Sequence, residues 1–212
     1  RVAHAKLLDK GVYIASPASC IRVLNRLAPA NYKEVNKKIT PIRPELKASS
    51  PCKVWCWDIT WLPSNVRGKY FYLYLIIDLY SRFIIDWEIH TTEDGTYARQ
   101  LFARAFAIHD IKEGDILTVH ADNGQTMRSV TLNELFNDLS VNATHSRPHT
   151  SNDNAFAESI FATMKGRVIY PEHFMTIEGA NGFVEQFVDW YNFEHKHSGL
   201  DYLSPYEVHM GL

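Results

Sequence analysis

The sequence lacks any apolar stretch long enough to cross a membrane. Its longest apolar run lies around residues 70–77, whereas a membrane-spanning helix needs about 20 apolar residues. The first residues also lack the basic and then apolar order of a secretory signal. We therefore expect a cytoplasmic protein without membrane contact. A chain of 212 residues, 46% of them hydrophobic, can bury one substantial core.

Cysteine is scarce, and its three positions, Cys20, Cys52 and Cys56, are odd in number. Such a set in a large domain argues against a disulfide framework and indicates reduced thiols. Cys52 and Cys56 could form half of a zinc site. No second close pair of ligands accompanies them at zinc-finger spacing, so we expect no zinc there.

Strong net charge is also absent, since the formal value is -2, but the charges are unevenly distributed. Residues 1–47 carry a net charge of +7, and the remainder carries -9. A basic arm suits contact with phosphates, and clustered carboxylates suit divalent metal ions. A solvated basic tail would have the same composition.

Three segments are expected along the chain. Two short helices around Gly11 predict a partial helix-turn-helix segment at residues 1–28, although any helical hairpin would give this pattern. Residues 29–51 are rich in proline and lysine and predict a basic linker. Residues 52–212 form the main domain. The chain ends soon after a helical pattern, so one interpretation is a core truncated at its C-terminus.

The main domain predicts an α/β fold. Alternating residues indicate a strand at 54–62, and β-rich runs at 70–78 and 82–90 indicate a hairpin. The remaining pattern predicts a helix at 96–109, a strand at 116–121, a helix at 131–139, a strand at 141–144, and helices at 153–168 and 177–192. This order is typical of a ribonuclease-H-like mixed five-stranded sheet flanked by helices, here preceded by a small helical segment.

Three acidic residues occupy positions that need an explanation. Asp58 lies inside an apolar strand, where burying its charge is costly, unless a neighbouring Arg or Lys forms a salt bridge with it. Asp122 follows a strand and lies at the carboxyl edge of the sheet, although Asp-Asn-Gly is also a good turn. Glu158 borders the apolar stripe of a helix, where a solvated helix face is the simple alternative.

Considered together, the three acids belong to a longer set of ordered motifs. There are 63 residues between Asp58 and Asp122 and 35 between Asp122 and Glu158. The motifs are Trp57-Asp58-Ile59-Thr60, Ile76-Ile77-Asp78-Leu79-Tyr80-Ser81-Arg82, His120-Ala121-Asp122-Asn123-Gly124, Ser146-Arg147-Pro148, Ser151-Asn152-Asp153-Asn154, Glu158-Ser159-Ile160-Phe161-Ala162-Thr163-Met164-Lys165 and Trp190-Tyr191-Asn192. They resemble those of bacterial insertion-sequence transposases of the OrfB type, which have a retroviral-integrase-like DDE catalytic core.

This resemblance implies a function and a cofactor. Asp58, Asp122 and Glu158 would converge and bind two Mg²⁺ ions, with Mn²⁺ as a substitute, for DNA strand cleavage and strand transfer by a 3′-hydroxyl. The partners implied are the element ends and target DNA, other copies of the chain, and a separate DNA-binding protein or segment. The protein would act on nucleoid DNA in the bacterial cytoplasm. Ala121 stands where the motif leads us to expect serine, outside the acid set.

Five further residues are candidates for DNA contact. They are Asn123, Arg147, Asn152, Asn154 and Lys165. The resemblance suggests that Lys165 contacts a phosphate or a terminal base, whereas a surface lysine is the plain alternative. The asparagines could position DNA or other ligands, but loop capping explains them nearly as well.

Two other functions remain open at this level. A nuclease of the same fold would hydrolyse DNA but would not join a 3′-hydroxyl end to a second DNA. A DNA-binding protein with an inactive core would lack metal affinity, although the presence of all three acids argues against it. Strand joining and metal binding therefore separate the three alternatives.

Overall fold

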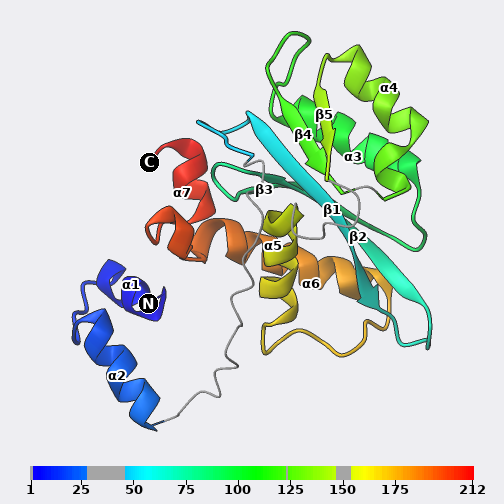
Figure 1. Ribbon diagram of the computed structural model, residues 1–212. Coiled ribbons are helices and arrows are strands. Elements are labelled where there is room, and N and C mark those ends of the chain that lie inside the picture. Colours follow the sequence, from blue (N-terminus) through cyan, green and yellow to red (C-terminus); the bar gives the residue numbers. More distant parts are fainter. Residues whose placement is uncertain (1, 28–45, 123, 147–153) are drawn as a thin grey trace, which may run out of the picture.

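The computed structural model describes residues 2–27, 46–122, 124–146 and 154–212, and its centre is a five-stranded sheet (Figure 1). The strands lie in the order β3-β2-β1-β4-β5. Their bounds are β1 (Val54–Pro63), β2 (Tyr70–Asp78), β3 (Ile84–His90), β4 (Thr118–Ala121) and β5 (Asn142–His145). β1, β2 and β3 pair antiparallel, whereas β4 is parallel to β1 and to β5. The predicted mixed sheet is therefore confirmed.

Helices cover both faces of the sheet (Figure 1). They are α3 (Gly95–Ile108), α4 (Val130–Asp138), α5 (Ala155–Lys165) and α6 (Ile177–Asp189). The alternation along β1 divides the core, because Trp55 and Trp57 pack with α3 and α4, whereas Val54 and Cys56 pack with α5 and α6. This arrangement explains why β1 is apolar on both faces.

The helix ends differ from the predicted ones in the C-terminal third. α5 ends at Lys165 and is capped by Gly166, so Val168 is fully exposed and does not extend the apolar stripe. α6 ends at Asp189 and continues as a π-helical turn, Trp190–Glu194. A further helix, α7 (Pro205–Met210), accounts for the helical pattern just before the end of the chain, and its capping box of Ser204 and Glu207 is visible in the sequence.

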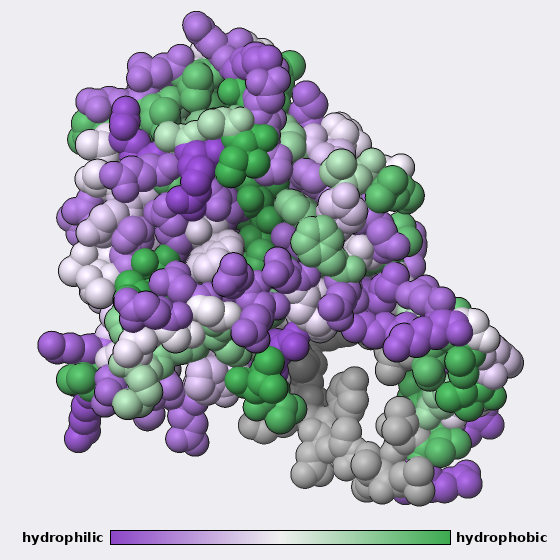
Figure 2. Space-filling view, turned by 180° about the vertical axis from the view of Figure 1, so that it is seen from behind, coloured by the Kyte–Doolittle hydropathy of each residue, from purple (hydrophilic) through white to green (hydrophobic). Residues whose placement is uncertain are grey.

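A small helical pair stands apart from the sheet (Figure 1). It consists of α1 (Val2–Asp9) and α2 (Pro17–Leu27), and Gly11 follows α1 with a φ of 71°. Lys196 Nζ lies 2.9 Å from Asp9 Oδ2, which connects α1 to the C-terminal region. Exposed apolar side chains gather on this pair (lower right in Figure 2), and they include Val12, Tyr13, Ile14 and Val23. In the described residues, no helix combines the length and apolarity needed to span a bilayer.

The first turn of α3 is tightly packed and gives a stability prediction. A Cβ at Gly95 would lie 2.3 Å from Ser129 Cβ. Gly95→Ala therefore forces α3 and the start of α4 apart, and we expect the free energy of unfolding to fall by about 1–3 kcal/mol. Urea denaturation followed by circular dichroism measures this change.

The matched control is Gly182→Ala in α6, where the added Cβ has no neighbour within 4 Å apart from the adjoining residues and the backbone of its own helix. Alanine favours a helix interior by up to about 1 kcal/mol over glycine, so this variant should be at least as stable as the wild type. Equal losses of stability in the two variants would contradict the packing argument.

Candidate active site

Asp58 lies in the middle of β1 with a half-buried carboxylate. Burial raises its pKa to about 7, opposed by the Ile59 N–H, which donates to Asp58 Oδ1 at 2.8 Å. The carboxylates of Asp122, Glu158 and Glu93 raise the pKa further. In the described part of the chain, no Lys or Arg forms a salt bridge with Asp58. The salt-bridge alternative therefore does not explain this buried acid.

The strand register places Asp122 beside Asp58. The parallel pairing of β1 with β4 runs from Val54 opposite Thr118 to Cys56 opposite His120. Continued by two residues, the same register sets Asp122 opposite Asp58, with both side chains on the α5 face of the sheet. Asp122 Oδ1 also accepts a hydrogen bond from the Gly124 N–H at 2.7 Å. Asp122 thus both forms a turn and belongs to an acidic site.

Glu158 approaches from α5, which packs against β1. The Glu158 side chain is exposed to solvent. It follows the buried Ala157, so it lies at the edge of the apolar stripe of α5. Its charge nevertheless acts on Asp58. Among the described residues, the oxygens of Asp58, Asp122 and Glu158 do not all lie within 4.8 Å of one another. A set of three separate carboxylates fits a hard divalent cation such as Mg²⁺, which prefers oxygen ligands.

Two predicted residues hold α5 against β1 near Asp58. Lys165 Nζ donates to Thr60 Oγ1 at 2.7 Å, and burial lowers the pKa of Lys165, opposed by the charge of Asp58. Lys165 is therefore not a simple surface lysine. Asn154 is buried, and its Nδ2 donates to the Trp57 carbonyl at 3.0 Å. This placement favours a positioning role for Asn154 over a direct contact with DNA.

The structure adds one acid that sequence reasoning missed. Glu93 lies between β3 and α3, where it raises the pKa of Asp58 and accepts a hydrogen bond from Thr126 Oγ1 at 2.7 Å. Its position after a strand, in an acidic pair with Asp94, was the available signal. Asn123, Arg147 and Asn152 lie outside the described residues.

The raised pKa of Asp58 gives a pH-dependent stability in the absence of divalent ions. Between pH 4 and 7 the folded state keeps a proton that the unfolded state loses, so folding is progressively disfavoured as the pH rises. The amide of Asp58→Asn does not titrate in this pH range, so this variant lacks the effect. We expect the wild type to lose up to about 4 kcal/mol of unfolding free energy relative to this variant between pH 4 and 8.

Urea denaturation in EDTA across this pH range measures the difference. Asp138→Asn, at an exposed position of α4, is the control and should follow the wild type at every pH. If the profiles of the wild type and Asp58→Asn were parallel, Asp58 would not carry the raised pKa.

Comparisons with known proteins identify the family of the chain. A family model described as "Integrase core domain" matches residues 48–151, and a second model of the same description matches residues 139–205. The transposase for insertion sequence element IS904 of Lactococcus lactis is 33% identical over 181 residues, which cover 82% of this chain and 70% of the relative. Transposase InsF for insertion sequence IS3A of Escherichia coli is 27% identical, over 85% of this chain and 62% of its own.

Solved structures show the same fold at low sequence identity. The HTLV-2 integrase catalytic core domain in complex with magnesium superposes with a TM-score of 0.57 at 12% identity, over 77% of this chain and 99% of that chain. The catalytic core domain of BIV integrase gives 0.53 at 17% identity, over 76% and 95%. The sheet order, the acidic site and the identity to the IS904 relative lead to one conclusion: the chain belongs to the insertion-sequence transposases and contains their integrase-type catalytic core, which has a ribonuclease-H-like fold.

Proposed function

We propose that this core cuts DNA at the ends of a mobile element and joins the freed ends to target DNA, with Asp58, Asp122 and Glu158 as its catalytic acids. The observation that carries the proposal is the convergence of the three acids: Asp58 is largely buried, which raises its pKa, and the charges of Asp122 and Glu158 raise that pKa further. The three acids come from β1, the end of β4 and α5, so only the folded chain brings them near one another. Perturbed carboxylates gathered from separate elements are typical of catalytic sites.

The three carboxylates would hold two Mg²⁺ ions, for which Mn²⁺ could substitute. Bound there, the ions would stabilise the charge on the attacking and leaving oxygens of an in-line phosphoryl displacement. Burial keeps a proton on the Asp58 carboxylate up to about pH 7, and cation binding would release it. The Gly124 N–H fixes the Asp122 carboxylate, and Asn154 fixes β1 to the start of α5.

No side chain has to act as a nucleophile in the proposed reaction. In the first step, water attacks a phosphodiester at the element end, the P–O3′ bond breaks, and a free 3′-hydroxyl and a 5′-phosphate result. In the second step, that 3′-hydroxyl attacks a target phosphodiester, a new P–O bond forms, and the target strand leaves with its own 3′-hydroxyl. Both steps are phosphoryl transfers, so a single acidic site can serve both.

The remaining parts of the chain suggest how DNA is held. We assign phosphate contact to Lys165, Asn123, Arg147 and Asn152, and further DNA contact to the α1 and α2 pair as a partial helix-turn-helix segment preceding a basic linker at 29–51 and the core at 52–212. Both ends of an element have to meet one target, so we expect a homo-oligomer. The chain spans 56% to 70% of the length of its relatives, so a separate DNA-binding protein or segment could complete end recognition.

Strand joining tests the proposal directly. The purified chain is incubated with a labelled DNA fragment that carries a free 3′-hydroxyl, a plasmid, and Mg²⁺ or Mn²⁺. We expect the label to enter the plasmid with the wild type and not with Glu158→Gln, because the amide removes one anionic ligand. The control is Glu185→Gln, at an exposed position of α6, which should join DNA like the wild type.

The products also distinguish the alternative functions. Nicked plasmid without joined label would support a nuclease of this fold. Joining by Glu158→Gln at the wild-type rate would remove Glu158 from the catalytic set. Failure of the wild type to nick or to join DNA with either metal ion would contradict catalysis by this chain.

Lys165 gives a second prediction. Its ammonium group lies beside Asp58 and Thr60, where a DNA phosphate bound at the acids would meet it. Loss of a charged hydrogen bond costs about 1.5–3 kcal/mol, so Lys165→Ala should reduce the joining rate by roughly 10-fold to 100-fold. Lys112→Ala, at an exposed loop lysine, is the control and should retain joining. An unchanged rate in Lys165→Ala would show that Lys165 only packs against β1.

A further inference from the structure

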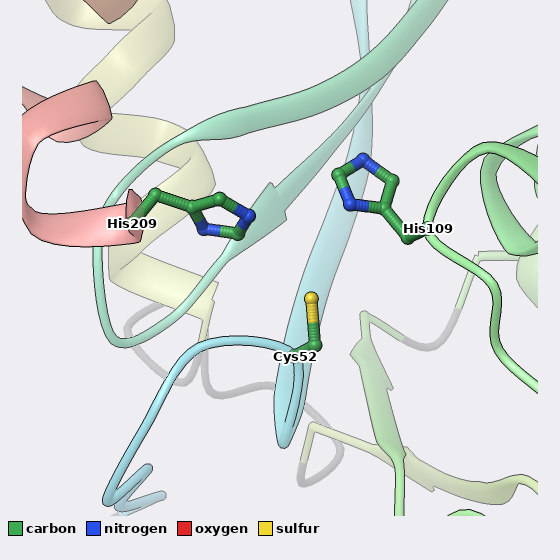
Figure 3. A group of neighbouring side chains, drawn as sticks. All are labelled: Cys52, His109 and His209. Atoms are coloured by element: carbon green, nitrogen blue, oxygen red, sulfur yellow. The ribbon is translucent and has the colours of Figure 1, made fainter. Parts of the chain in front are cut away.

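A second group of potential metal ligands lies at another place in the fold. Cys52, just before β1, His109, just after α3, and His209 in α7 each offer a ligand atom, and these atoms all lie within 4.8 Å of one another. Figure 3 shows the Cys52 sulfur between the two imidazoles, with the three side chains pointing toward one another. We propose that Cys52, His109 and His209 form a zinc site.

The hydrogen bonds of His209 fix which of its nitrogens is available. Asp78 is fully buried, and its Oδ1 accepts from Ser81 Oγ at 2.8 Å. The only hydroxyl proton of Ser81 is thereby used, so Ser81 Oγ accepts from His209 Nδ1–H at 2.9 Å. The neutral His209 ring then has its free lone pair on Nε2. A carboxylate relay of this kind commonly orients histidine ligands of metal ions.

His109 is oriented in a similar way. One of its ring nitrogens is hydrogen bonded to the Ile85 carbonyl, which leaves the other nitrogen free to bind a metal ion. The two rings also pack on aromatic neighbours, with His209 stacked on Phe83 at 4.7 Å and His109 edge-on to Trp55 at 5.7 Å. Packing accounts for the ring planes, but not for the convergence on the sulfur.

The position of Cys52 is equally constrained. Its backbone has a φ of 58°, and its N–H donates to Asp78 Oδ2 at 2.7 Å. Trp55 Nε1 is buried without a hydrogen bond of regular geometry and lies near the Cys52 sulfur. A thiolate bound to a cation would give this indole N–H an acceptor. The same Asp78 carboxylate thus organises both Cys52 and His209.

The chemistry of the ligands favours Zn²⁺ over the ions expected at the acids. One thiolate and two imidazoles form a borderline-soft set that suits Zn²⁺, whereas Mg²⁺ prefers oxygen. Tetrahedral bonds of about 2.0–2.3 Å require ligand atoms roughly 3.3–3.8 Å apart, so side-chain shifts of about 1 Å would close the site. The three side chains are half-buried, and a water molecule can therefore provide the fourth ligand.

Cys52 and Cys56 have different surroundings. Cys56 is fully buried in the core on the α5 and α6 face, and burial raises its pKa to about 12. It is Cys52 alone that joins a ligand group, with partners 57 and 157 residues further along the chain. The bound ion would fasten the C-terminal helix α7 and the end of α3 to the start of β1.

Cobalt titration tests the proposal, because tetrahedral Co²⁺ bound to a thiolate has a sulfur-to-metal charge-transfer band that an all-oxygen site lacks. The full chain, reduced and stripped with EDTA, is titrated with Co²⁺ and then with Zn²⁺. We expect the band to saturate at one equivalent of Co²⁺ and to disappear when Zn²⁺ displaces Co²⁺. Zn²⁺ should also raise the melting temperature relative to EDTA.

The variants separate this site from the rest of the chain. Cys52→Ser, a near-isosteric change, should abolish the band and the rise in melting temperature with Zn²⁺, while its melting temperature in EDTA stays near that of the wild type. His209→Asn should also lose the band. Cys20→Ser, His173→Asn and Glu158→Gln should keep it. Absence of the band in the wild type, or its persistence in Cys52→Ser, overturns the proposal.

Discussion

The cost of placing a carboxylate in the middle of an apolar strand governs the rest of this structure. Asp58 is flanked along β1 by Trp57 and Ile59, and burial is the largest of the causes that raise its pKa to about 7. No salt bridge from the described residues relieves this cost. Instead, further carboxylates approach it, which makes ionisation still less favourable. Such an arrangement is costly for the chain by itself, and a bound cation of the kind proposed would offset that cost.

The fold brings the acids together through strand register. β1 is the only strand of the described sheet with an antiparallel neighbour on one side and a parallel neighbour on the other. Extending the register of β1 and β4 by two residues beyond Cys56 and His120 brings Asp58 level with Asp122, and α5 packs against β1 with Glu158. Hydrogen bonds from Lys165 and Asn154 connect α5 to β1 at positions on either side of Glu158. The helix contacts that stabilise the fold therefore also position the site.

Much of this was predictable from local pattern. Alternating apolar residues around Trp55 and Trp57 indicate a strand, and the helical spacing in 96–109 indicates a helix. Each pattern is local to one element, and the structure confirms both elements. The end of α5 was misjudged because Val168 continues the apolar spacing, whereas Gly166 caps the helix. Glu93 was missed because its approach to Asp58 depends on how the loop before α3 folds back. The approach of Cys52 to His109 and His209 was not predictable, because these residues lie far apart along the chain and only the fold brings their side chains together.

The central claim is that Asp58, Asp122 and Glu158 form one metal-binding site. A crystal structure of the chain soaked with Mn²⁺, with anomalous scattering measured at the manganese edge, tests it most directly. The account predicts an anomalous peak in contact with carboxylate oxygens of all three residues. A fully soaked crystal with manganese bound elsewhere, and none at Asp58, would contradict it.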